Sequence, residues 1–432
     1  MTGSSAVEPE SEATRAETST RAVLANAVFS RYLFTFFLSN IGTFMQALGV
    51  PFLLFRLTRS STWVGAGTVA GQGMAVLASP LSGVLSDRVG PKRVLIVSQL
   101  VQIVASVSLW MLSLQSGLTP WRILGCLMVG GFGSGLQFAS AQALLPELVS
   151  PRQIGPGVRL MSLTFNVPRS FGPALAGLVL ASKGPAFTFG INTLSFIPFV
   201  AVLLTLRVTN ERSPGSEEPW SEQILGGVRE LWSKPAVRNA SLYAFLLSLL
   251  GVAIFLHTSD LGVGVYHTDA AGVGWLQAVY GLGAAIGSLW LIYDNGRTRA
   301  LGVGIGGLVA HGVGGLLILL PSHLNLVAFA GFAIMGAGNA FGYVALGTVV
   351  QTECDPIYRG RVTAANLMFL LVGSPIGSFA CGALADATGI RWSFLAFAGA
   401  LTVSSLVIAV RFYRPSGGAR ARRLPVVSMA QP

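Results

Sequence analysis

The sequence predicts an all-α integral membrane protein with twelve transmembrane helices in two six-helix halves. Three observations lead to this fold class. First, only 10% of the 432 residues are charged and 52% are hydrophobic, whereas a soluble domain carries about 25% charged residues. Second, many apolar runs approach the roughly 20 residues that cross a bilayer as a helix. Third, turns with many basic residues alternate along the chain with turns that have few, as an even number of spans requires.

Twelve apolar segments lie between polar turns along the chain. The seventh contains His257 and Asp260, and the ninth is rich in glycine. The expected spans are 32–55, 63–86, 94–115, 121–145, 159–182, 186–206, 239–262, 272–293, 300–320, 324–350, 362–385 and 392–412.

The distribution of lysine and arginine orients the chain. With a cytoplasmic N-terminus, the cytoplasmic segments hold 22 of these residues and the external segments hold five, while Arg169 lies inside a span. The net charge of +11 is therefore mostly a topogenic signal, and no nucleic acid is expected as a partner. Both termini are expected in the cytoplasm. The preference for Arg over Lys favours the plasma membrane of a bacterium with a GC-rich genome.

The longest polar interval between spans, at about 207–238, divides them six and six. Its second part has apolar residues near helical spacing, which predicts a short amphipathic helix on the inner membrane face, with a loop as the alternative. A shift of 205 positions aligns Gly172 with Gly377 and Gly177 with Gly382, as parallel halves would. The expected division is a disordered tail at 1–29, a first half at 30–207, a linker at 208–237, a second half at 238–413 and a tail at 414–432.

Charge is concentrated in the turn between the second and third spans. This turn reads GVLSDRVGPKRV and contains Asp87, Arg88, Lys92 and Arg93. Gly90 supplies the chain reversal, and Gly83 is expected to let a neighbouring helix approach closely. An acidic residue contributes nothing to topology, so Asp87 is expected to meet a helix N-terminus or an arginine across a helix interface.

This turn resembles the loop signature of the major facilitator superfamily, G-x-L-[AS]-D-R-x-G-[RP]-[KR]-[KR], in the place where that family has it. The matching residues are Gly83, Leu85, Asp87, Arg88, Gly90, Lys92 and Arg93. The resemblance covers residues 30–413 and implies the major facilitator fold. It also implies that Asp87 meets the start of the eleventh span, near Arg359 and Arg361, and locks the cytoplasmic side while the protein faces outward. A purely topogenic loop with a capping Asp87 is the alternative.

Two further stretches point to a branch of that family. In the fifth span, VPRSFGPALAG resembles part of the antiporter signature of drug exporters at Gly172, Pro173 and Gly177, with Pro168 in place of a glycine. The segments LLPELVSPRQIGPGVRL and TECDPIYRGRVTAANLM resemble the macrolide-efflux and siderophore-exporter branch. These resemblances imply a secondary active exporter of drugs or amphiphilic metabolites that works by alternating access. For the fifth span, a helix kink without functional meaning is the alternative.

The energy source is expected to be an ion gradient, most simply protons, because the chain has no GxxxxGK[ST] motif and no soluble domain to hold one. Proton coupling requires a titratable group inside the membrane. The candidates are His257, Asp260 and His311. The alternatives are a solvated loop position for Asp260 and a packed, hydrogen-bonded side chain for His311.

Polar residues within the spans are candidates for a central cavity. Arg169 is the sharpest, because an arginine in the middle of a span costs several kcal/mol unless it is paired or wetted. In a functional role, Arg169 is expected to attract an anionic cargo or to tune a nearby proton site. In a structural role, it is expected to donate hydrogen bonds to backbone carbonyls at the Pro168–Pro173 break. The cavity candidates are Asn40, Gln46, Gln137, Asn166, Arg169, Tyr280 and Asn339. With interspersed Phe, Met and Leu, they favour a bulky amphiphile over a sugar.

Other functions and partners are less well supported by the sequence. The three cysteines form no CxxC, and no metal or cofactor is expected. The expected partners are a small-molecule substrate, protons and the lipid bilayer, and the chain is expected to be a monomer. An importer of a small metabolite or a non-transporting membrane sensor are the rival functions, and a membrane enzyme is disfavoured by only four histidines. The stretch GALADATG at 382–389 resembles the loop signature again, but its external position excludes the same gate role.

Overall fold

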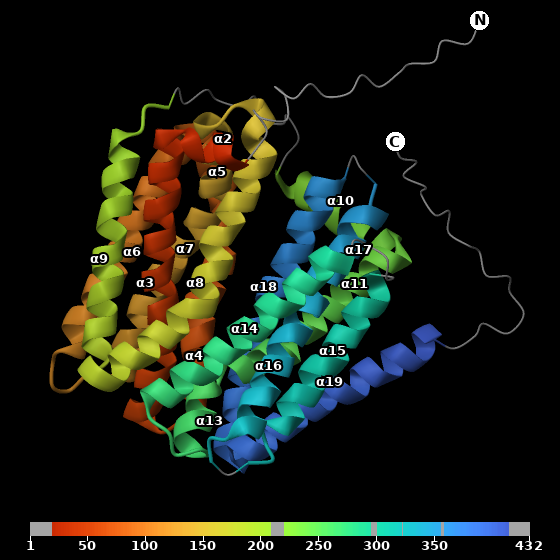
Figure 1. Cartoon of the computed structure of the whole chain (residues 1–432). Coiled ribbons are helices and arrows are strands. Elements are labelled where there is room, and N and C mark those ends of the chain that lie inside the picture. The colour runs from red at the N-terminus through yellow and green to blue at the C-terminus, as the bar shows by residue number, and fades with distance from the viewer. Residues whose placement is uncertain (1–19, 209–219, 295–299, 322, 356–357, 414–432) are drawn as a thin grey trace, which may run out of the picture.

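The computed structural model describes residues 20–208, 220–294, 300–321, 323–355 and 358–413, and all regular structure in these ranges is helical (Figure 1). The first ten segments are α2 Thr20–Ala25, α3 Ala27–Thr58, α4 Ser61–Thr68, η1 Val69–Gly73, α5 Met74–Val89, α6 Pro91–Ser113, α7 Pro120–Leu148, η2 Pro151–Gln153, α8 Ile154–Lys183 and α9 Pro185–Thr205. The others are α10 Trp220–Ser233, α11 Pro235–Leu246, η3 Leu247–Val252, α12 Ala253–Leu256, α13 Thr258–Gly264, α14 Ala270–Asp294, α15 Ala300–Leu317, α16 Leu326–Ala340, η4 Phe341–Ala345, α17 Leu346–Glu353, α18 Arg359–Thr388 and α19 Ile390–Tyr413.

Each predicted span coincides with one long helix or with a run of consecutive helical segments. Within the described ranges, eleven of these are long and apolar enough to cross a membrane. The remaining one is α8, a helix of 30 residues that carries Arg169. The chain is therefore an all-α, multi-pass membrane protein, as the sequence predicts.

The long helices form two groups (Figure 1). Segments α3 to α9 make the first group, and α11 to α19 make the second. Buried aromatic rings such as Tyr32, Phe36 and Phe199 stack within the first group, and a separate buried cluster around Leu247 and Leu308 lies in the second. We refer to the end of the bundle that holds α10 and the start of α3 as the α10 end, and to the opposite end as the α13 end.

The first helix begins earlier than the sequence predicts. Residues 20–25 form α2, and the buried Val23 packs into the first group, so the expectation of a disordered tail reaching residue 29 is wrong for this segment. The Asn26 side chain accepts hydrogen bonds from the backbone N–H groups of Val28 and Phe29, and its amide donates to the Leu148 carbonyl. An asparagine in this position caps a helix, which fixes the start of α3 at Ala27. Residues 1–19 and 414–432 lie outside the described ranges.

The predicted amphipathic helix is α10, which excludes the loop alternative for residues 220–233. One face of α10 packs on the second group. Leu231 is buried there, and a Cβ on Gly227 would lie 2.6 Å from the Arg361 carbonyl oxygen of α18. Val228 and Trp232 are exposed. The helix therefore covers the start of α18 at the α10 end.

The two groups are joined at the α13 end. There α4 lies against α18 and α8 lies against α14. A buried apolar cluster spans the junction, with Met45, Leu48 and Leu180 from the first group and Ala270 and Val273 from the second. In Figure 1 the two groups converge at this end and diverge toward the α10 end.

Candidate functional site

The motif in the fifth span lies at two close helix crossings. A Cβ on Gly172 would lie 2.7 Å from Phe44 Cβ of α3, and one on Gly177 would lie 2.7 Å from the Cα of Gly274 in α14. Any larger side chain at Gly177 would force the two groups apart. Pro173 is buried in the same stretch, and its carbonyl oxygen faces Gly274. Gly172 thus lies at a crossing within the first group, whereas Gly177 and the Pro173 carbonyl lie where the two groups meet.

Polar side chains join α18 to the first group. Ser374 Oγ donates to Gln72 Oε1 at 2.5 Å, and Ser378 Oγ donates to Thr68 Oγ1 at 3.2 Å. Ser374 and Ser378 are four residues apart, so they lie on one face of α18. The predicted His257 also contacts this face of α18, since its Nε2 lies 2.8 Å from the Ser378 carbonyl oxygen.

His257 and Asp260 form a buried pair at a helix break. The seventh span is interrupted at His257, between α12 and α13. His257 Nδ1 lies 2.5 Å from Asp260 Oδ2, and neither side chain is exposed to solvent. The alternative of a solvated loop position for Asp260 is therefore wrong. Instead, the turn that begins α13 places the Asp260 carboxylate next to the His257 imidazole.

The hydrogen bonds of His257 identify its protons. A carbonyl oxygen only accepts, so Nε2 donates to Ser378. A hydrogen bond between Nδ1 and Asp260 Oδ2 then requires one further proton, since without it both atoms can only accept. The second carboxylate oxygen, Oδ1, is buried without a hydrogen-bond partner among the described residues. The geometry is that of a pair holding a proton, because removing it would leave an uncompensated buried charge.

His311 has a different environment. Its Nδ1 donates to the Met335 carbonyl oxygen at 2.9 Å, which ties α15 to α16. The ring packs edge to face on Tyr280, with 6.2 Å between centroids. This contact pattern favours the packed, hydrogen-bonded alternative for His311 over a proton-carrying role.

The predicted gate turn lies at the α10 end. Gly90 adopts φ 91°, which favours glycine, and it ends α5 where α6 begins. Lys92 Nζ donates to the Leu206 carbonyl oxygen at 2.6 Å and so ties α6 to the end of α9. Asp87, Arg88 and Arg93 are exposed. Among the described residues, Asp87 has no hydrogen bond or ion pair.

The expected partners of Asp87 lie at the start of α18, in the second group. Arg361 packs on the ring of Tyr358, with its guanidinium carbon 5.9 Å from the ring centroid. The side chain of Arg359 lies outside the described residues. A Cβ on Gly83 would have no neighbour within 4 Å, so the close helix approach predicted at Gly83 is absent here. Among the described residues, no hydrogen bond or ion pair joins Asp87 to the start of α18 in this conformation.

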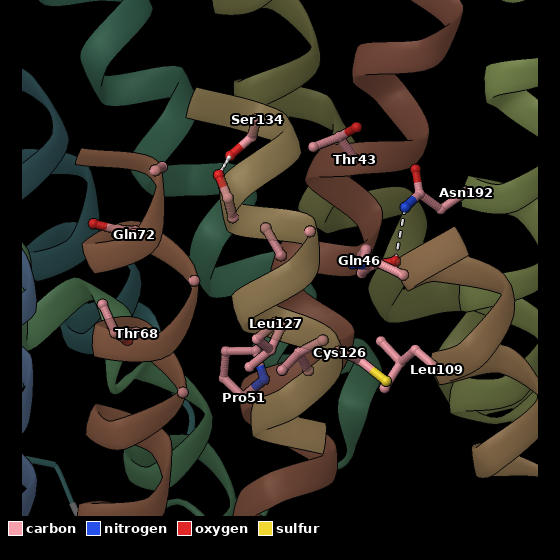
Figure 2. A pocket seen from close by; sticks show the side chains of 18 of the residues that line it. Thr43, Gln46, Pro51, Thr68, Gln72, Leu109, Cys126, Leu127, Ser134 and Asn192 are labelled. Atoms are coloured by element: carbon pink, nitrogen blue, oxygen red, sulfur yellow. Dashed lines mark hydrogen bonds between the residues drawn. The ribbon is translucent and has the colours of Figure 1, made fainter. Parts of the chain in front are cut away.

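A cavity of about 280 Å³ opens within the first group (Figure 2). It lies between α3, α4 with η1, α6, α7 and α9, and Leu256 of α12 also contributes to its wall. The described lining residues are uncharged. Apolar positions such as Val50, Leu54 and Leu109 alternate with amides and hydroxyls, namely Thr43, Gln46, Thr68, Gln72, Gln102, Ser134 and Asn192.

Amide side chains are ordered around this cavity. In Figure 2 the Asn192 amide points at Gln46, and its Nδ2 donates to Gln46 Oε1 at 2.7 Å. Ser106 Oγ donates to the same oxygen at 3.2 Å. Deeper in the group, Gln102 Nε2 donates to Gln137 Oε1 at 2.6 Å. Of the predicted cavity residues, Gln46 lines the space and Gln137 positions a lining side chain.

The other predicted cavity residues lie elsewhere. Asn40, Tyr280 and Asn339 are buried, and each has a polar side-chain atom without a partner among the described residues. Arg169 is exposed and interacts electrostatically with Tyr280 and Tyr343 of the second group. It therefore faces the interface between the groups. The side chain of Asn166 lies outside the described residues.

Four of these site residues are not among those predicted from the sequence: Gln72, Asn192, Ser374 and Ser378. Each is an uncharged polar residue inside an apolar span, which is the signal that selected Gln46 and Gln137. That signal does not show which helix face points inward. No group of three His, Cys, Asp or Glu side chains able to hold a metal occurs among the residues that the structure describes.

Comparison with known proteins agrees with this architecture. The model of a family described as transmembrane secretion effector matches residues 18–426. The chain is 23% identical over 380 residues to the multidrug efflux pump Tap of Mycolicibacterium fortuitum, covering 84% of this chain and 90% of that protein. It is 25% identical over 391 residues to the enterobactin exporter EntS of Escherichia coli O1:K1 / APEC, covering 87% and 88%.

Solved transporters share the fold at lower identity. The nucleoside transporter NupG superposes with a TM-score of 0.70 at 14% identity, covering 90% of this chain and 100% of that one. A bacterial homolog of the human lysosomal transporter Spinster, solved in an inward-facing and unoccupied conformation, gives 0.71 at 14% identity, covering 89% and 97%.

Proposed function

The chain belongs to the transmembrane secretion effector family of the major facilitator superfamily, and we propose that it exports amphiphilic drugs or metabolites by alternating access. One observation carries the mechanism. The two helix groups are joined at the α13 end, while the gate turn with Asp87 is exposed at the α10 end. A transporter that alternates must adopt such a one-sided conformation and its opposite.

The α10 end is the cytoplasmic end in this proposal. The turns at that end hold most of the basic residues, and cytoplasmic loops carry the excess of Lys and Arg. The conformation is then inward-facing, with the external side closed. An exporter in this state collects its cargo from the cytoplasm or the inner leaflet. The membrane is the plasma membrane of a bacterium, and both termini are cytoplasmic.

Protons drive export in this proposal, and the His257–Asp260 pair carries them. The pair is buried, holds one proton by its hydrogen-bond geometry and contacts α18 through Ser378. The described titratable groups that face it are both on α18: Asp386 acts electrostatically on His257, and Cys381 lies near Asp260. Intramembrane ionisable pairs in such positions mark proton pathways.

The cavity indicates an uncharged cargo region with both apolar and hydrogen-bonding parts. Its described walls offer amides and hydroxyls but no charge. Its volume of about 280 Å³ is near the lower end, about 300 Å³, of small-molecule sites. It thus accommodates one part of an amphiphile, while the rest extends toward the interface that Arg169 faces.

Replacing Gln46 by leucine tests the cavity. Gln46→Leu removes the acceptor for Asn192 and Ser106, so an amphiphile bearing one amide is expected to lose about two- to tenfold in efflux rate relative to its alkyl analogue, the range of one hydrogen bond. The measurement is efflux of the two fluorescent analogues from loaded cells. Gln277→Leu is the matched control, since Gln277 is a buried amide of α14 outside the cavity wall. If the ratio of the two efflux rates is the same in Gln46→Leu as in the wild type, Gln46 does not contribute to cargo recognition.

Direction and coupling are tested in membrane vesicles. Inside-out vesicles containing the protein are expected to accumulate a fluorescent amphiphile when an inside-acidic proton gradient is imposed, and a protonophore is expected to abolish the uptake. Vesicles from cells with the empty vector give the baseline. Gradient-driven accumulation only in right-side-out vesicles would establish the importer alternative. Binding of the amphiphile without flux in either orientation would establish the sensor alternative.

A further inference from the structure

At the α13 end, one carboxylate of the second group binds the backbone of the first. Asp386 lies in the last turn of α18. Its Oδ1 accepts the backbone N–H of Ser61 at 2.7 Å, and its Oδ2 accepts that of Thr62 at 3.0 Å. The Ser60 hydroxyl donates to Oδ2 as well.

These donors are the free N–H groups that begin α4. The first N–H groups of a helix have no partner within the helix, and the helix dipole places partial positive charge there. Ser60 occupies the N-cap position, but its own side chain makes no capping bond. The cap of α4 is therefore supplied by Asp386 from the opposite group. Bonds of this kind, with an ionised acceptor, are stronger than neutral ones.

The capping contact exists only while the two helices touch. A Cβ on Gly382 would lie 2.3 Å from the Ser61 carbonyl oxygen, and one on Gly65 would lie 2.6 Å from the Ser378 carbonyl oxygen. The backbones of α4 and α18 thus meet directly beside Asp386. When the external side opens, these surfaces must separate, and α4 loses its cap.

We propose that Asp386 is the latch of the external gate and that it stabilises the conformation seen here. The proposal rests on the alternating access proposed above. It gives the GALADATG stretch a role at the opposite end from the signature that it resembles. Asp386 caps a helix of the first group while the α13 end is closed, and Asp87, on the first group, is exposed in the same state. One carboxylate latch is engaged and the other is released.

Hydrogen exchange measured by mass spectrometry tests the latch without depending on cargo. In Asp386→Ala, the Ser61 and Thr62 amides are expected to exchange about two- to thirtyfold faster, the range for loss of a helix cap. Peptides at the start of α14, residues 270–277, are also expected to exchange faster, because they pack on α8 and become exposed when the gate opens. Asp386→Asn keeps the shape of the side chain and is expected to show the same pattern at smaller amplitude.

Asp269→Ala is the matched control. Asp269 lies at the same end and accepts the Gly272 N–H, so it caps α14 within its own group. Its loss is expected to leave the Ser61 and Thr62 amides unchanged. Faster exchange confined to residues 60–63 in Asp386→Ala would overturn the latch and leave a local cap only. Hydrogen exchange is measured without transport. If the vesicle experiment contradicts the exporter proposal, the exchange experiment therefore still tests the Asp386 latch.

Discussion

Asp260→Asn is expected to reduce proton-driven export at least about fivefold while the protein remains folded in the membrane. The substitution keeps the size of the side chain but removes the carboxylate that shares a proton with His257. Without the Asp260 carboxylate, cargo movement and proton movement no longer depend on the same titratable group. Coupling between sites typically amounts to about 5- to 150-fold, so gradient-driven accumulation is expected to fall by at least the lower bound, and downhill exchange of cargo is expected to persist.

The measurement is uptake into inside-out vesicles with and without a proton gradient, at matched protein content. Ser259→Ala is the control, since the Ser259 hydroxyl is buried beside Asp260 and has no partner among the described residues. Accumulation by Asp260→Asn that still responds fully to the gradient would remove the pair from the mechanism. A fall in thermal unfolding temperature with unchanged coupling would assign the pair a structural role only.

Asp87→Asn is expected to slow export about tenfold, the effect of losing one charge-assisted hydrogen bond. The reason is conformational: Asp87 is exposed in the present conformation, which we propose is inward-facing, so its substitution is expected to destabilise only the proposed outward-facing state in which the α10 end closes. The thermal stability of the inward-facing protein is expected to stay the same.

Trypsin provides a second readout, because Arg88, Arg93 and Arg361 all lie at the α10 end. Asp87→Asn is expected to be cleaved faster there than the wild type, whereas Asp87→Glu, which keeps the charge, is expected to behave more nearly like the wild type. Equal export and equal cleavage in Asp87→Asn and wild type would support the purely topogenic interpretation of the turn.

The helices were predictable because each must satisfy its own backbone in the membrane, and apolar length alone reveals that requirement. The start of α3 was less predictable. It depends on the Asn26 cap and on a contact between Asn26 and Leu148, 122 residues away. The seventh span was predicted as continuous because nothing in the local sequence marks His257 as a helix break.

The site was predictable where a motif or a rare residue type pointed to it, and less so where helix rotation decides. Gly177 was selected by a motif, and it does lie where the groups meet. His257 and Asp260 were selected separately as rare intramembrane groups, yet their pairing follows from the turn that begins α13. Asn192 and Ser378 were missed because polar residues of their type also occur on packed, non-functional faces.

The closed α13 end consists of two crossings with different chemistry. At α8 and α14, glycine backbones meet beside a buried apolar cluster, and such packing is insensitive to dissolved ions. At α4 and α18, glycine backbones also meet, but the partly exposed charge of Asp386 adds a polar contact. The attraction between a carboxylate and the N-terminus of a helix is weakened by dissolved salt. If the α13 end is external, as proposed, salt outside the cell is therefore expected to weaken the Asp386 contact more than the packing of α8 on α14, and α4 is expected to separate from α18 first.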